Sequence, residues 1–132
     1  MPTTTYTHAI PCFRYADARA AIDWLVRAFG ARPGEVFDGP DGKVMHAEVW
    51  LGPACVMMGT VKNDEYGPSQ PGQCQAYIVV SDAAGVDALH DRAVAAGAKI
   101  VISLRDTDYG SHDFACHDPE GNFWSFGTYA PK

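Results

Sequence analysis

Apolar side chains recur with helical spacing in two stretches of the chain. In residues 18–29 they fall on one stripe of a helix. Asp17 precedes this stretch as a favourable N-cap, and Gly30 follows it where a left-handed residue commonly ends a helix. A second stretch, residues 82–96, ends before Gly97. The pattern therefore predicts two amphipathic helices.

Segments typical of strands surround both predicted helices, and Gly, Pro and Asp separate them. Around the first helix they cover residues 9–15, 35–38, 44–51 and 54–60, and around the second they cover 73–80, 99–104, 113–117 and 122–128. Each half of the chain thus has the order β-α-β-β-β. A shift of 65 positions carries Asp17 onto Asp82, and a shift of 68 carries Ala47 onto Ala115. The chain is therefore interpreted as a duplication.

One such module has a sheet too small to bury its own apolar face, so two modules must pair to enclose a core. We predict an α+β fold in which tandem βαβββ modules form a cup from curved mixed sheets. Residues 1–132 would form a single domain, with modules at about 5–60 and 73–129 joined by loop 61–72. The sequence leaves open whether the modules pair within the chain or across a dimer.

The composition of the chain excludes several classes of protein. The 132 residues include 10 Lys and Arg against 16 Asp and Glu, which gives a formal net charge of −6. An acidic chain without a basic cluster lacks the electrostatic footprint of a nucleic-acid-binding protein. It also has no long apolar span and no signal-peptide pattern at its start. We therefore expect a cytoplasmic protein with neither nucleic acid nor membrane as a partner.

The strongest local motif lies near the end of the chain. Residues 109–114 are YGSHDF and residues 118–126 are DPEGNFWSF, in which Asp-Pro-x-Gly favours a type I turn. Together with Tyr15, Asp17 and the helical segment AIDWL at 21–25, this motif resembles the vicinal oxygen chelate superfamily of glyoxalases, bleomycin resistance proteins and dioxygenases. Within that superfamily the PhnB-like branch is the nearest in pattern. The resemblance implies the glyoxalase/bleomycin-resistance fold, paired as a homodimer.

Enzymes of that superfamily typically hold a divalent metal with four side chains, one each from the first and last strand of each module. The resemblance places Ile10, Met57, Gln75 and Ser125 at those positions. Only the Gln75 amide suits a hard divalent ion, since the others supply an alkyl group, a thioether and a hydroxyl. We therefore expect no metal at this site and no cofactor.

Strand alternation assigns further side chains to the inside of the cup. His46, Glu48 and Trp50 share one face of their strand, and Tyr109 lies in a loop that can cover the cup mouth. Trp50 and Phe114 are equally compatible with the hydrophobic core. The predicted ligand-binding set is Ile10, Cys12, His46, Glu48, Trp50, Met57, Gln75, Tyr109, Phe114 and Ser125.

Two functions fit this set. In the first, the protein binds a small organic molecule in a metal-free cup, as in sequestration of an antibiotic or other xenobiotic. Glu48 beside aromatic walls suits a cationic aromatic ligand. In the alternative, the protein is a lyase, isomerase or dioxygenase of the superfamily with an atypical metal or none. His46 and Glu48 are then the candidates for general acid and base.

Overall fold

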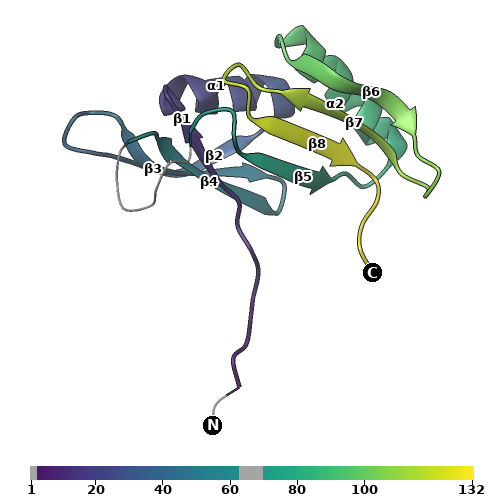
Figure 1. Cartoon of the computed structure of the whole chain (residues 1–132), viewed down its shortest axis with the longest axis horizontal. Coiled ribbons are helices and arrows are strands. Elements are labelled where there is room, and N and C mark those ends of the chain that lie inside the picture. The colour runs from purple at the N-terminus through teal and green to yellow at the C-terminus, as the bar shows by residue number, and fades with distance from the viewer. Residues whose placement is uncertain (1–2, 63–69) are drawn as a thin grey trace.

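The chain folds into two four-stranded sheets, each packed against one helix (Figure 1). The computed structural model describes residues 3–62 and 70–132. The elements are β1 (Cys12–Tyr15), α1 (Ala18–Phe29), β2 (Arg32–Asp38), β3 (Val44–Leu51), β4 (Ala54–Thr60), β5 (Gln75–Val79), α2 (Ala83–Ala95), β6 (Lys99–Asp106), β7 (His112–His117) and β8 (Phe123–Gly127). Within these ranges, no helix is both long enough and apolar enough to cross a membrane.

The two sheets have the same topology. The first sheet has the order β1-β4-β3-β2, and the second has the order β5-β8-β7-β6. Strand β1 is parallel to its neighbour β4, and β5 is parallel to its neighbour β8. All other neighbouring strands are antiparallel. The predicted α+β fold with two βαβββ repeats is confirmed. Most of the predicted connection, residues 63–69 of loop 61–72, lies outside the described residues.

Local sequence signals define both helices as expected. The Asp17 carboxylate accepts a hydrogen bond from the Ala20 amide, and Gly30 follows α1 with φ of 69°. The Asp82 carboxylate accepts from the Gly85 amide in the same way at the start of α2. These bonds satisfy backbone groups that have no partner inside the helix.

Strand β1 is shorter than the pattern predicted, because it begins at Cys12 and not at residue 9. The carbonyl of Pro11 still accepts a hydrogen bond from the Met57 amide at 3.0 Å. The residues before it have no neighbouring strand, and the segment runs away from the body of the protein (Figure 1). Tyr6 in this segment is 90% exposed. Extended residues that lack a partner strand cannot form a ladder, which explains the shorter strand.

One hydrophobic core spans both sheets and both helices. Phe29 of α1 packs against Trp124 and Phe126 of β8, with ring centroids 5.3 and 4.7 Å apart. The Trp24 indole donates a hydrogen bond to the Ala96 carbonyl at the end of α2, at 2.7 Å. The helices and the inner faces of the two sheets therefore form a continuous core. Among the described residues, no helix packs on the opposite faces of the sheets.

Phe114 corrects the sequence-based assignment of the cup wall. Its side chain is only 1% exposed and belongs to the core. The ring stacks on Phe126 of the neighbouring strand and meets His90 of α2 edge to face, at 5.1 Å. Phe114 therefore faces the helices and not the open side of the sheet.

The reason is a one-residue error in the alignment of the two modules. Glu48 pairs with Met57 in the first sheet, whereas Ala115 pairs with Ser125 in the second. The equivalent residues on β3 and β7 are thus 67 positions apart, while those on β4 and β8 are 68 apart. A slip of one residue moves every side chain of a strand to the other face.

Candidate functional site

The uncovered faces of the two sheets carry most of the predicted site. Along β3, Ala47 and Val49 are buried toward the core, while His46, Glu48 and Trp50 alternate with them and are partly exposed. We call this uncovered side the ligand face. From the first sheet it includes Cys12, His46, Glu48, Trp50, Cys55 and Met57, and from the second it includes Gln75, Tyr77, Asp113, Ala115, Phe123 and Ser125.

Trp50 is the aromatic side chain that β3 contributes to the ligand face. Gly34 of β2 lies against its indole edge, so closely that an added Cβ would be 2.9 Å from the indole nitrogen. The Arg32 guanidinium carbon is 5.9 Å from the ring centroid, within the range of a cation–π contact. The indole is therefore held in place while part of it stays open to solvent.

Glu48 is the carboxylate of this face. Its Oε2 is 3.7 Å from Nε2 of His46, and the two side chains are 31% and 37% exposed. The His46 ring is 6.1 Å from the ring of Phe37 on the edge strand. The pair can bind a cation or exchange a proton with a bound molecule.

Cys55 lies beside this carboxylate. Partial burial raises the pKa of the Cys55 thiol, and the negative charge of Glu48 raises it further. A thiol with a raised pKa stays protonated at neutral pH and is a weak nucleophile. Cys55 therefore adds polarizable contact surface, as does the neighbouring thioether of Met57.

The four positions at which the superfamily resemblance places metal ligands carry side chains that do not suit a divalent ion. Met57 and Ser125 occupy equivalent places on β4 and β8, and Gln75 begins β5. Ile10 lies just before β1. The Gln75 amide and the Ser125 hydroxyl offer oxygen atoms, but neither carries the negative charge that would hold a divalent ion against water. Within residues 3–62 and 70–132, no group of three or more His, Cys, Asp or Glu side chains is arranged to hold a metal.

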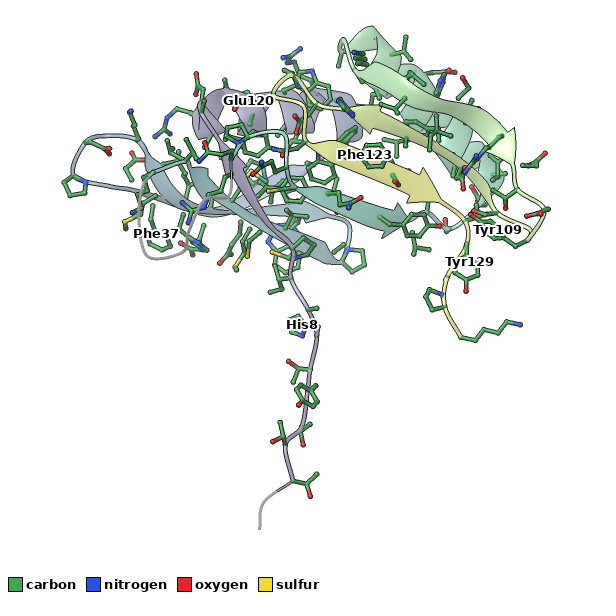
Figure 2. The ribbon with its side chains drawn as sticks, in the orientation of Figure 1. His8, Phe37, Tyr109, Glu120, Phe123 and Tyr129 are labelled. Atoms are coloured by element: carbon green, nitrogen blue, oxygen red, sulfur yellow. The ribbon has the colours of Figure 1, made fainter. Side chains whose placement is uncertain are left out.

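Tyr109 borders the ligand face at its far end. It lies between β6 and β7, is 60% exposed, and meets the Tyr129 ring edge to face at 5.7 Å. Figure 2 shows Tyr109 and Tyr129 together at the end of β8 opposite Glu120. The sequence-based set omitted Tyr129 and Tyr77. Alternation along β5 marks Tyr77, two residues beyond Gln75, but no local pattern marks Tyr129.

Two cavities lined by described residues lie away from this face. One of about 400 Å³ lies beside the β2–β3 turn, with Pro40 and Lys43 in its lining. Another of about 190 Å³ lies between α1 and the β7–β8 turn, next to Trp24 and Pro119.

Comparison with known proteins shows which sequences and structures this chain resembles. The sequence model described as Glyoxalase/Bleomycin resistance protein/Dioxygenase superfamily matches residues 6–126. TioX from Micromonospora sp. ML1 is 31% identical, with a TM-score of 0.77 over 95% of this chain and 100% of that one. An uncharacterized protein of Mycobacterium tuberculosis H37Rv is 34% identical over 122 residues, which are 84% of this chain and 68% of that protein. A glyoxalase-related enzyme from Fulvimarina pelagi, at 21% identity and a TM-score of 0.71, shares the fold.

Proposed function

The chain belongs to the glyoxalase/bleomycin resistance protein/dioxygenase superfamily, and from that premise we propose that it binds a small organic molecule on the ligand face without a metal. The observation that carries the proposal is the partly exposed wall of Trp50, Met57 and Glu48. Such a wall offers an aromatic plane, a polarizable surface and one negative charge. The narrower assignment to the PhnB-like branch stays a prediction.

The chemistry of the wall favours a flat aromatic cation as ligand. An indole face attracts organic cations through its quadrupole and stacks on planar rings. Glu48 can pair with the positive charge, since its carboxylate is only partly exposed and the nearby His46 is its one described ion-pair partner. Sequestration of an antibiotic or another xenobiotic is the physiological role that we propose for this binding.

We also propose that a second copy of the chain encloses the ligand face. The uncovered side of the sheets exposes Phe37, Tyr77, Val79 and Val101, each between 44% and 50% accessible. Exposed apolar surface of this extent is typical of an interface. The segment before β1 also leaves the body of its own chain with Tyr6 almost fully exposed, as expected of an arm that packs on another molecule.

Catalysis is the second candidate function, and the His46–Glu48 pair favours it. An imidazole with a carboxylate 3.7 Å away can move a proton to or from a bound substrate. If the protein is an enzyme of this kind, His46→Gln abolishes turnover and leaves ligand binding intact. Binding without turnover in the unmodified protein would reject this candidate in favour of sequestration.

The binding proposal is tested with ethidium, a planar aromatic cation, by fluorescence titration at neutral pH. We expect Trp50→Ala and Glu48→Gln each to weaken binding by about 3- to 30-fold, the range of a cation–π or partly buried charge contact. Asp91→Asn is the matched control, because Asp91 is an exposed carboxylate on α2 with 82% of its side chain accessible. Absent binding, or equal affinity in all variants, would reject the assignment of this face. A native mass spectrum that shows stoichiometric divalent metal would overturn its metal-free character.

A further inference from the structure

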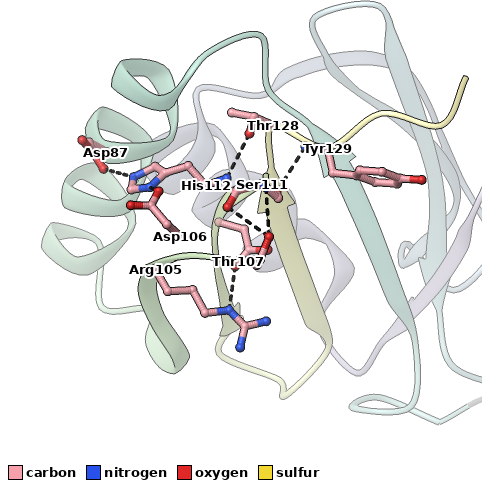
Figure 3. A network of polar contacts seen from close by, with 9 residues as sticks. Asp87, Arg105, Asp106, Thr107, Ser111, His112, Thr128 and Tyr129 are labelled. Carbon is pink, nitrogen blue, oxygen red and sulfur yellow. Dashed lines mark hydrogen bonds and ion pairs between the residues drawn. The ribbon is translucent and has the colours of Figure 1, made fainter. Parts of the chain in front are cut away.

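His112, the first residue of β7, lies between two carboxylates (Figure 3). Its Nε2 is 2.6 Å from Oδ1 of Asp87 on α2, and its Nδ1 is 2.8 Å from Oδ1 of Asp106 at the end of β6. A neutral imidazole donates from only one nitrogen, and its other nitrogen would face a carboxylate oxygen with a lone pair. Only the imidazolium satisfies both contacts. This bridge therefore joins α2 to the β6–β7 turn in the protonated state.

The surrounding charges favour that state. Hydrogen bonds that the His112 ring donates to the carboxylates of Asp87 and Asp106 raise the pKa of His112 above its ordinary value of 6.5. Among the cations of the neighbouring strands, Arg105 pairs instead with Asp113, at 3.0 Å. Asp113 follows His112 on β7, so its side chain points to the other face of the sheet. Asp108 in the adjoining turn adds another negative charge.

The backbone around His112 also holds the end of the ligand face. The His112 amide donates to Oγ1 of Thr128 at 3.0 Å, and the Thr128 amide donates to the His112 carbonyl at 3.2 Å. The Tyr129 amide donates to Oγ of Ser111 at 3.2 Å. Within the turn, the Thr107 amide donates to the Ser111 carbonyl at 2.7 Å. The bridge and these bonds fix the turn and the segment after β8 together (Figure 3).

Three partly exposed tyrosines depend on this arrangement, and we call them the tyrosine rim. Tyr77 of β5, Tyr109 of the turn and Tyr129 are 44%, 60% and 47% exposed. The Tyr77 hydroxyl donates to the Tyr129 carbonyl at 2.8 Å, and the rings of Tyr109 and Tyr129 are nearly perpendicular. Gly127 lies under Tyr77, where an added Cβ would be 2.6 Å from the hydroxyl oxygen. The rim presents ring faces and edges at the border of the ligand face.

We propose that protonated His112 holds the tyrosine rim in place, so that the affinity for an aromatic cation falls as His112 loses its proton. This inference rests on the proposed function, because the rim acts on a molecule bound at the ligand face. A histidine whose pKa is raised by folding stabilises the folded arrangement in full at pH values below its ordinary pKa of 6.5. That contribution disappears as the pH rises through the raised value. Above it, the neutral ring has a hydrogen to donate to only one of the two carboxylates, so the bridge between Asp87 of α2 and Asp106 of β6 is broken.

Nuclear magnetic resonance tests the bridge without any ligand. We expect His112 to titrate above 6.5, the ordinary value for histidine, because carboxylates accept hydrogen bonds from both of its ring nitrogens. Asp87→Asn and Asp106→Asn should each lower the titration midpoint of His112. Amide exchange in residues 107–111, corrected for its intrinsic pH dependence, should accelerate as His112 titrates. His112→Gln should remove that step, and His90→Gln should leave it unchanged.

Ethidium titration tests the consequence for binding. His46 lies on the ligand face itself, so the affinities are compared in the His46→Gln background, which removes its imidazole. We expect ethidium to bind about fivefold more weakly at about pH 9 than at about pH 6, the lower end of coupling between sites. In this background, His112→Gln should abolish the difference between the two pH values.

The outcomes separate the two proposals. A His112 midpoint at or below 6.5, or an exchange step that persists in His112→Gln, overturns the bridge. Ethidium affinity that is independent of pH, while His112 titrates as expected, overturns the regulatory role. Absence of ethidium binding at both pH values overturns the proposed function, and the exchange measurements then still decide whether His112 holds the rim.

Discussion

At the scale of single residues, Asp118 joins the two halves of the core. One of its carboxylate oxygens accepts hydrogen bonds from the Tyr15 hydroxyl at 2.6 Å and from the Trp124 indole at 3.0 Å. Its other oxygen accepts from the amides of Glu120 and Asn122. Burial, with the Asp118 charge, raises the pKa of Tyr15 far above the ordinary range. A residue that the sequence marks only as a turn former is thus also a buried acceptor.

We expect Tyr15→Phe to lower the free energy of unfolding by about 1–3 kcal/mol, the usual cost of losing a hydrogen bond to a charged group. Tyr15 is 1% exposed, so water cannot replace the lost donor. Urea denaturation measures the change. Tyr6→Phe is the matched control, since Tyr6 is 90% exposed within one chain and the substitution keeps the ring that would pack on a second copy, so stability should be unaltered.

At the scale of elements, the β7–β8 turn also caps a helix of the other module. The Glu120 carboxylate accepts hydrogen bonds from the amides of Ala16 and Asp17, at 2.6 and 2.9 Å. Both amides lie at the start of α1, where a negative charge is favourable. The sequence predicted the turn and the helix separately. Their contact depends on the packing of the two modules, because about 100 residues separate Glu120 from α1.

Glu120→Gln should therefore destabilise the protein by about 0.5–1 kcal/mol, the effect expected from a weakened cap at a partly exposed helix end. The amide keeps one acceptor and loses both the second acceptor and the charge. Thermal unfolding followed by circular dichroism measures this change. Glu35→Gln, on an exposed edge strand, supplies the control. An equal effect of both substitutions would show that Glu120 acts through net charge and not through the cap.

At the scale of the whole molecule, the ligand face and the projecting N-terminal segment both present surface for contact with a second copy of the chain. Both expose apolar or extended chain that a single copy leaves uncovered. A stable dimer interface buries roughly 1,200 Å² or more of total surface. In the proposed dimer, each chain contributes its ligand face and its N-terminal segment to that interface. The proposed cup would then combine walls from two chains or from the two modules of one chain.

Removal of residues 1–9 tests this assembly. We expect the full chain to give a dimer in native mass spectrometry and the shortened chain to give mainly monomer, with weaker ethidium binding. Both should retain the same helical circular dichroism, because the removed residues precede β1 and lie outside the core. A full chain that is monomeric at micromolar concentration would contradict the dimer, and an unchanged dimer after shortening would reject the role of the segment.

The sequence by itself determined the elements and the family. Helix caps such as Asp17 and Asp82 act on amides a few residues away, and the turn at residues 118–121 depends on its own residues. Such local signals do not depend on the rest of the fold. The match between the two halves then indicated the duplicated βαβββ order, which the structure has.

Tertiary structure alone decided which side chains share a face and which meet across the fold. Phe114 faces the core because strand pairing, and not the repeat in the sequence, sets the register of β7. His112 meets Asp87 because α2 packs on the second sheet, and Tyr77 meets Tyr129 because β5 lies beside β8. These contacts join residues 25 and 52 positions apart. The physical reason is that packing between segments brings such pairs together. Periodicity within a single segment carries no information about that packing.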